Sequence, residues 1–159
     1  MLRIGHGQDV HRFDPGRPLV LGGVEIESPR GGLAGHSDAD VLTHAVASAL
    51  LGALALGDLG QHFPATDARW RGVSSLEILR AVYAMVRQRG FALVNCDATV
   101  VAEEPRLSPH LPRMRAALAR VLDVDPERVS VKATTAEGLG ALGRAEGIAA
   151  HAIVLVSDD

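Results

Sequence analysis

The pattern of hydrophobic and polar positions changes period several times along this chain. The segment Arg3–Arg12 is predicted to form a first strand, and Pro18–Glu27 holds two short aliphatic runs around a Gly-Gly turn, which indicates a small hairpin. Over Asp40–Leu56 the apolar positions then follow the 3.6-residue period of a helix with one apolar face. That face comprises Leu42, Val46, Ala49, Leu50 and Ala53.

The second half of the chain continues this mixture of helices and strands. A helix is expected to start at Ser74, where Ser74 and Glu77 make a capping-box pattern, and to end at Gly90. Prolines 109 and 112 open another helical stripe, and the residues Thr134–Glu137 could cap a short helix. The predicted strands of this half are Phe91–Ala102, Val129–Ala133 and the almost uninterrupted apolar run Ile148–Val156.

These elements predict an α+β fold and not a doubly wound sheet, because helices and strands mix without strict βαβ alternation. We find no internal repeat, linker or low-complexity tract, so residues 1–159 are expected to form a single domain. The expected architecture is a two-layer α/β sandwich, in which helices pack on one face of a mixed sheet.

Composition and charge then exclude several classes of function. The chain is 47% apolar with a net charge of −3, so binding to nucleic acid or to an anionic membrane surface is not expected. Its longest apolar stretch, Ala45–Leu56, is well short of the ~20 residues that span a bilayer. Cys96 is the only cysteine, which excludes an internal disulfide and favours the reducing cytoplasm.

The first candidate for chemistry is an Asp-x-His pair within the first predicted strand. Residues two apart on a strand share a face, so Asp9 and His11 are expected to lie side by side. Such a pair can ligate a metal, although for the pair taken alone a simple Asp-His hydrogen bond at the surface is the favoured explanation.

A second cluster at the start of the first predicted helix favours the metal. The segment from His36 to His44 holds two histidines and two aspartates. Asp9, His11 and His44 would give zinc two imidazoles, one carboxylate and an open fourth position. The competing set is Asp38, Asp40 and His44; we prefer the first set, which joins two elements and leaves Asp40 to orient a histidine.

A third candidate lies near the C-terminus, in the segment Lys132–Gly140. Its two threonines and its backbone amides are predicted to stand at a helix start, where an anion such as phosphate is favoured. Thr134 and Glu137 also suit a plain capping box. Arg144 follows closely and could contact an anion or only pair with Glu146.

Four motifs in this order resemble the 2-C-methyl-D-erythritol 2,4-cyclodiphosphate synthase family of the non-mevalonate isoprenoid pathway. They are G-H-G-x-D-V-H-R-F, G-H-S-D-x-D-V-x-x-H-A, A-L-G-D-L-G and K-A-T-T-x-E-x-L-G. The resemblance spans nearly the whole chain. It implies a homotrimer of small α/β sandwiches with active sites between neighbouring subunits.

The resemblance also implies the roles of individual residues. Asp9, His11 and His44 would hold Zn²⁺, Glu137 would contact Mg²⁺ or Mn²⁺, and His36 with Thr135 would stabilise the transition state. The segment Ala102–Ser108 would line the cytidine diphosphate pocket of an adjoining subunit. The full set of expected substrate-binding residues is Asp9, His11, His36, Ser37, Asp58, Gly60, Asp67, Ala102, Pro105, Arg106, Thr134, Thr135, Glu137 and Arg144.

Four positions depart from the family pattern. Ser48 stands where the family usually has Asp on the zinc-bearing helix, and Ala39 replaces the Gly of H-S-D-G-D. Ala65 replaces the first Asp of F-P-D-T-D, and Ala141 stands where an aromatic residue is frequent. These departures do not change the three expected zinc ligands, and they also leave His36, Thr135 and Glu137 in place.

The implied reaction is intramolecular, and its substrate is a small nucleotide diphosphate. The 2-phosphate of 4-diphosphocytidyl-2-C-methyl-D-erythritol 2-phosphate attacks its own β-phosphorus and releases CMP, so no protein nucleophile is required. Cations are needed to bring the two anionic groups together. The alternatives are a zinc phosphohydrolase that uses the same three ligands to activate water, and a trimeric nucleotide-binding or regulatory module whose metal is structural.

Overall fold

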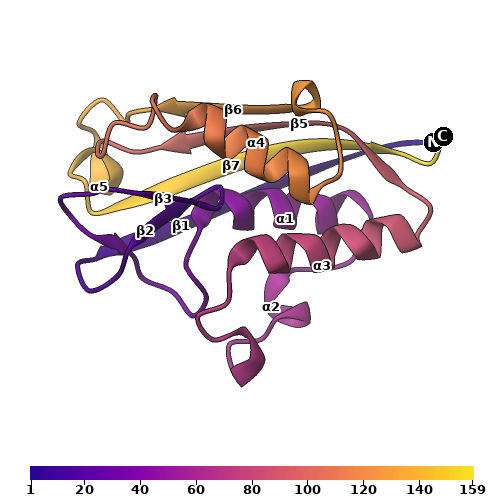
Figure 1. Cartoon of the computed structure of the whole chain (residues 1–159), viewed down its shortest axis with the longest axis horizontal. Helices are drawn as coiled ribbons and strands as arrows, with labels where there is room; N and C mark the ends of the chain where they lie inside the picture. The colour runs from indigo at the N-terminus through magenta and orange to yellow at the C-terminus, as the bar shows by residue number, and fades with distance from the viewer.

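The computed structural model describes residues 1–159 as one α+β domain, with a five-stranded sheet, a separate two-stranded hairpin and a layer of helices (Figure 1). The strands are β1 (Leu2–Asp14), β2 (Leu19–Leu21), β3 (Val24–Ile26), β4 (Gly32–Leu33), β5 (Ala92–Val101), β6 (Val129–Thr134) and β7 (Gly147–Ser157). The helices are α1 (Val41–Ala53), α2 (Leu59–His62), α3 (Ser75–Gln88), α4 (Leu111–Val121) and α5 (Gly140–Gly143), with short 3₁₀ turns η1 (Ala68–Trp70) and η2 (Pro126–Arg128).

The large sheet has the strand order β4-β1-β7-β5-β6 and is mixed, as the sequence predicts. Strands β5 and β6 are parallel, and all other pairs are antiparallel. The last strand pairs along its whole length with the first, from Leu2 opposite Ser157 to Arg12 opposite Gly147. This pairing places the two ends of the chain together (Figure 1).

Helix α1 is more deeply buried than its sequence pattern predicts. The expected single apolar face is wrong, because ten of its thirteen residues are buried, including Val41, Ala45 and Leu51. The helix lies between the sheet on one side and α3 on the other (Figure 1). Only His44, Ser48 and Gly52, four residues apart, form a partly open stripe along it.

Two glycines of β1 allow α1 to lie directly on the sheet. A Cβ on Gly5 would lie 1.9 Å from the carbonyl oxygen of Ala49, and one on Gly7 would lie 2.0 Å from that of Ala45. No side chain fits at either place. Gly5 and Gly7 share their face of the strand with Asp9 and His11, so the close approach of the helix brings it to those two side chains.

Helices α3 and α4 begin close to the predicted points. Ser74 caps α3 and accepts the N–H of Leu76, but Glu77 pairs with Arg80 instead of closing a capping box. Pro112 stands in the first turn of α4. No helix of the structure combines the length and the apolar character that a bilayer crossing requires.

The residues Thr134–Glu137 do not cap a helix as predicted, and the short helix that follows begins later. Strand β6 runs to Thr134, a turn follows at residues 137 and 138, and the four-residue α5 starts only at Gly140. Glu137 has a φ of +52°, a left-handed conformation that a right-handed helix cannot contain. The expected helix N-terminus for an anion is therefore absent at this point.

Candidate metal centre and active site

Three predicted metal ligands meet where α1 crosses β1. Asp9 and His11 lie on the face of β1 that α1 covers, and His44 lies in the first turns of α1. One ligand atom from each residue lies within 4.8 Å of the others, and no other group of three potential metal ligands in the chain does so. The structure thus joins the set that the sequence analysis prefers.

The carboxylate of Asp9 stands at the centre of this group. Its Oδ2 is 2.8 Å from Nε2 of His11 and 3.0 Å from Nδ1 of His44. The side chains are 25%, 20% and 15% exposed for Asp9, His11 and His44, so the centre is mostly shielded but still open to a ligand.

The second ring nitrogen of each histidine determines what the first can do. Nδ1 of His11 is 2.6 Å from the carbonyl oxygen of Ala34, which can only accept, so Nδ1 must carry a proton. In a neutral ring, Nε2 then presents its lone pair to Asp9.

The ring of His44 is oriented by a serine and an aspartate. Its Nε2 is 2.8 Å from Oγ of Ser75, whose hydroxyl donates to Oδ1 of Asp38. Because the proton of Ser75 goes to the carboxylate, the serine oxygen accepts from Nε2–H of His44. Nδ1 of His44 therefore also presents a lone pair to Asp9.

Two imidazole lone pairs and a carboxylate thus converge on one point, and their mutual repulsion is relieved only by a proton or a cation between them. Burial alone raises the pKa of the Asp9 carboxyl. Once the facing nitrogens of His11 and His44 carry a proton, their hydrogen bonds to Asp9 outweigh burial and hold that pKa well below its usual range. The bond to Asp9 also raises the pKa of His11. Two histidines and one carboxylate are a donor set that suits zinc with an open fourth position.

The competing set of Asp38, Asp40 and His44 is not formed. Asp40 is fully buried and caps α1, accepting the N–H groups of Gly22, Gly23 and Thr43. Its carboxylate also accepts the hydroxyl of Thr43, so no oxygen is left for a metal or a histidine. The expectation that Asp40 orients a histidine is therefore wrong, and Asp38 acts on His44 through Ser75 instead.

The three ligands open into a cavity of about 390 Å³ between β1, α1 and the segment that contains α2. Several residues expected from the sequence line this cavity, together with Ser48: Asp9, His11, His36, Ser37, His44, Asp58 and Gly60. Nε2 of His36 is buried there and has no hydrogen-bond partner. A buried polar atom without a partner costs free energy of folding, which indicates that a bound ligand supplies the missing hydrogen bond.

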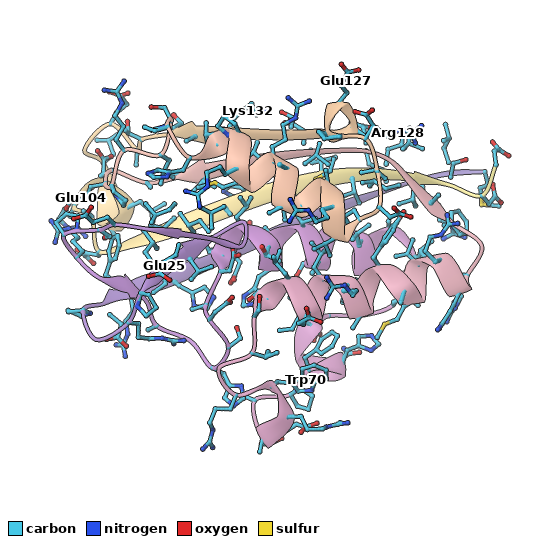
Figure 2. The ribbon with its side chains drawn as sticks, viewed as in Figure 1. Glu25, Trp70, Glu104, Glu127, Arg128 and Lys132 are labelled. Atoms are coloured by element: carbon cyan, nitrogen blue, oxygen red, sulfur yellow. The ribbon has the colours of Figure 1, made fainter.

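The loop between α2 and α3 forms one wall of the cavity. Phe63 and Trp70 contribute to the lining, and their rings meet edge to face at 4.9 Å. Figure 2 shows Trp70 beyond α2, at the edge of the molecule far from Lys132 on β6. Asp67 does not line the cavity; it caps η1 and pairs with Arg69 at 2.6 Å.

A second, smaller cavity of about 230 Å³ lies at the ends of β5 and β6. It contains the other group of expected residues, namely Ala102, Pro105, Arg106, Thr134 and Thr135, together with Glu103, Leu107, Ser108 and Ala133. The two cavities have no residue in common. The metal ligands and the threonines therefore lie in two separate cavities of one chain.

In the loop that follows Thr134 and Thr135, a side chain already accepts hydrogen bonds from two of the backbone amides. Oε1 of Glu103 accepts the N–H of Ala136 at 2.9 Å and that of Gly138 at 3.2 Å. The predicted use of these amides for an anionic ligand therefore needs correction. Glu137, between them, is exposed and contacts only the hydroxyl of Thr135.

Other charged residues near this loop have partners of their own. Arg144 pairs with Glu146 at 2.7 Å, as one of the two sequence interpretations expects. Lys132 pairs with Asp97 at 2.7 Å on the neighbouring strand. Cys96 is buried, and burial raises the pKa of its thiol to about 12, so it is no nucleophile.

The sequence pattern did not predict the cavity-wall residues Gln8, Leu59, Phe63, Trp70 and Ile78, nor Ser75 beside His44. For Ser75 a signal exists in the sequence, because two adjacent serines, Ser74 and Ser75, stand at the start of α3. One caps the helix, and the second has no role in capping and lies fully buried.

Comparisons with known proteins agree with this geometry. The chain matches the YgbB family over residues 2–157. It is 58% identical over 154 residues to the 2-C-methyl-D-erythritol 2,4-cyclodiphosphate synthase of Symbiobacterium thermophilum, a match that covers 97% of this chain and 98% of that protein. Its identity to the enzyme of the same name from Syntrophomonas wolfei is 57% over 155 residues, covering 98% of each chain.

Solved structures are similar over the whole fold. A CDP-bound form of 2C-methyl-D-erythritol-2,4-cyclodiphosphate synthase has a TM-score of 0.89 and 41% identity, and the match covers 98% of this chain and 100% of that one. The bifunctional IspDF of Campylobacter jejuni has a TM-score of 0.93 and 44% identity. There the match covers 98% of this chain but 42% of the longer protein.

Proposed function

The chain belongs to the YgbB family of 2-C-methyl-D-erythritol 2,4-cyclodiphosphate synthases, enzymes of isoprenoid biosynthesis, and on that premise we propose which of its residues carry the reaction. The enzyme cyclises 4-diphosphocytidyl-2-C-methyl-D-erythritol 2-phosphate. An oxygen of the 2-phosphate forms a bond to the β-phosphorus, the bond from that phosphorus to the bridging oxygen breaks, and this oxygen leaves with CMP.

The observation that carries the metal assignment is the convergence of Asp9, His11 and His44 in a cavity. These three side chains would hold Zn²⁺, and Glu137 would hold Mg²⁺ or Mn²⁺, for which one carboxylate together with substrate phosphates is an ordinary ligand set. When bound, these ions supply positive charge that offsets the repulsion between the reacting phosphates.

The remaining residues bind and orient the substrate. His36 lines the metal cavity with an unpartnered buried Nε2, which we assign to a hydrogen bond with a phosphate oxygen as charge develops there. Ser37, Asp58 and Gly60 line the same cavity and would contact the methylerythritol phosphate. Asp67 lies beyond that lining, and its contact with substrate would require the loop to close further.

The second cavity would receive the cytidine diphosphate part. Ala102, Pro105 and Arg106 form its wall, and Thr134 and Thr135 offer hydroxyl groups to the diphosphate. Glu103 occupies the loop amides and Lys132 is paired with Asp97, so a divalent ion at Glu137 would supply positive charge to the diphosphate beside that of Arg106. Arg144 would join the site after leaving Glu146.

We further propose a homotrimer in which each active site combines the two cavities of neighbouring subunits. The separation of the two cavities within one chain supports this arrangement. So does the sheet face that α1 leaves uncovered, because Ile4, Val10 and Ile153 are 70%, 64% and 49% exposed there. A free, buried Cys96 supports a location in the cytoplasm.

The decisive experiment is ³¹P NMR of the purified protein with the proposed substrate, Zn²⁺ and Mg²⁺. We expect a cyclic diphosphate and CMP in equal amounts. Release of inorganic phosphate or of an open-chain phosphate would instead indicate a zinc phosphohydrolase. Binding of substrate without any product would indicate a nucleotide-binding or regulatory module.

A further inference from the structure

We propose that Ser75, held by Asp38, is a positioning residue of the metal centre that selects which nitrogen of His44 faces the metal. The hydroxyl oxygen of Ser75 accepts a hydrogen bond from Nε2–H of His44. This leaves Nδ1, with its lone pair, as the ligand atom. The inference rests on the proposed zinc site, but it concerns residues outside the three ligands.

Ser75 is placed with little freedom. It is the first residue of α3, and it is fully buried. Its backbone N–H donates to Oδ2 of Asp38 at 2.9 Å, while its hydroxyl donates to Oδ1 of the same carboxylate. Two hydrogen bonds to one carboxylate hold both the backbone and the side chain of this serine.

The carboxylate determines the direction of the whole chain of hydrogen bonds. An ionised carboxylate can only accept, so the single hydroxyl proton of Ser75 is used by Asp38. If that proton pointed to His44 instead, a serine lone pair would face Oδ1 of Asp38 and repel it, and this partly buried oxygen would keep only the N–H of Asp40, at 3.2 Å, as a donor. The serine oxygen must therefore accept from Nε2–H of His44, and in the neutral ring Nδ1 presents a lone pair to Asp9.

Another hydroxyl near His44 cannot replace this effect. Oγ of Ser37 is 3.2 Å from Nε2 of His44, and it accepts the N–H of Ala39 at 3.3 Å. No carboxylate accepts the hydroxyl proton of Ser37. It can therefore act as donor or acceptor toward the ring and does not select a tautomer.

Two variants test the inference. Ser75→Ala removes the acceptor for Nε2–H. Asp38→Asn nearly preserves the shape but places an amide NH₂ beside Ser75, which frees the serine proton to turn toward Nε2 and moves the imidazole proton to Nδ1. Ser74→Ala is the matched control, because it removes the cap of the same helix without touching His44.

The measurements are the dissociation constant for Zn²⁺, by competition with a chromophoric chelator, and the ¹⁵N chemical shifts of the His44 ring in folded, metal-free protein. We expect zinc affinity to fall 10- to 100-fold in Ser75→Ala and Asp38→Asn, as for other groups that orient metal ligands, and to be unchanged in Ser74→Ala. In Asp38→Asn the ring shifts should report a proton on Nδ1. If Ser75→Ala does not fold, Asp38→Asn decides alone.

Wild-type affinity together with the wild-type tautomer in Asp38→Asn would overturn the inference. An equal loss of affinity in Ser74→Ala would also overturn it, because helix stability and not proton direction would then be responsible. Failure of the zinc site itself has a different signature. In that case the wild-type protein and His11→Ala would bind zinc equally weakly.

Discussion

Oε1 of Glu103 lies 2.9 Å from the backbone nitrogen of Ala136, so a carboxylate at the end of β5 holds the loop that follows β6. The same oxygen accepts the N–H of Gly138, on the other side of Glu137. These two bonds hold a turn in which Glu137 and Gly138 both have positive φ, of 52° and 73°. The direction of the Glu137 side chain therefore depends on Glu103.

We predict that Glu103→Ala impairs this loop without unfolding the domain. Two amide hydrogen bonds to a charged acceptor are lost, which is expected to cost about 2 kcal/mol locally. The Mg²⁺ concentration for half-maximal cyclisation should rise several-fold. Glu104→Ala is the control, because Glu104 points outward and pairs only with Arg30 (Figure 2). Equal Mg²⁺ dependence in the two variants would contradict the role of Glu103.

The structure of this loop could not be predicted from its local sequence. The pattern of residues 134–137 suits a capped helix, but a carboxylate more than thirty positions earlier in the chain selects a left-handed turn. Asp40 is a similar case. Its spacing from His44 suggests a shared face, yet the turn at Gly22 and Gly23 supplies two N–H groups that capture its carboxylate.

The parts that were predicted correctly depend on local periods. The residues of β1 alternate between two faces, and this alone places Asp9 beside His11. The position of His44 follows from the helical period only roughly, because α1 is buried almost all round. What brings it to Asp9 is the pair Gly5 and Gly7, whose packing role becomes visible only once the helix lies on the strand.

We predict that Gly7→Ala separates the helix from the strand. The new methyl group would lie 2.0 Å from the carbonyl oxygen of Ala45, so α1 must shift, at a cost of about 3 kcal/mol of stability. Zinc affinity should fall as His44 moves away from Asp9. In contrast, Gly52→Ala adds a methyl group 3.6 Å from the carbonyl oxygen of His6 and should be neutral or stabilising by up to about 1 kcal/mol. Urea unfolding and zinc titration of both variants check this, and equal stabilities would show that the helix tolerates the shift.

A third prediction separates the metal ligand from the helix cap. His44→Ala should lose bound zinc after dialysis and keep its fold, since His44 is only partly buried. Asp40→Asn should instead keep zinc in the folded fraction but lose about 3 kcal/mol of stability, because buried N–H groups lose an acceptor. Elemental analysis and thermal unfolding measure the two effects. Zinc retained in His44→Ala and lost in Asp40→Asn would restore the competing set of ligands.

The last prediction concerns Glu137 and the second cation. Its side chain is exposed and contacts only the hydroxyl of Thr135, at 3.3 Å, so Glu137→Gln should change stability by less than about 0.5 kcal/mol. A carboxylate beside a diphosphate is repelled unless a divalent ion lies between them, and an uncharged amide is a poor ligand for Mg²⁺. Cyclisation should therefore fall at least tenfold and require more Mg²⁺.

The matched control is Glu127→Gln, which changes another exposed glutamate, in η2 at the opposite end of β6 (Figure 2). It should cyclise substrate at the wild-type rate, because no charge near Thr134 and Thr135 is altered. Thermal unfolding must be measured beside activity in both variants. Glu137 takes no part in capping a helix. A loss of activity at unchanged stability would therefore show that its carboxylate binds the divalent cation. Wild-type cyclisation by Glu137→Gln with unchanged Mg²⁺ dependence would leave Glu137 only its place in the turn.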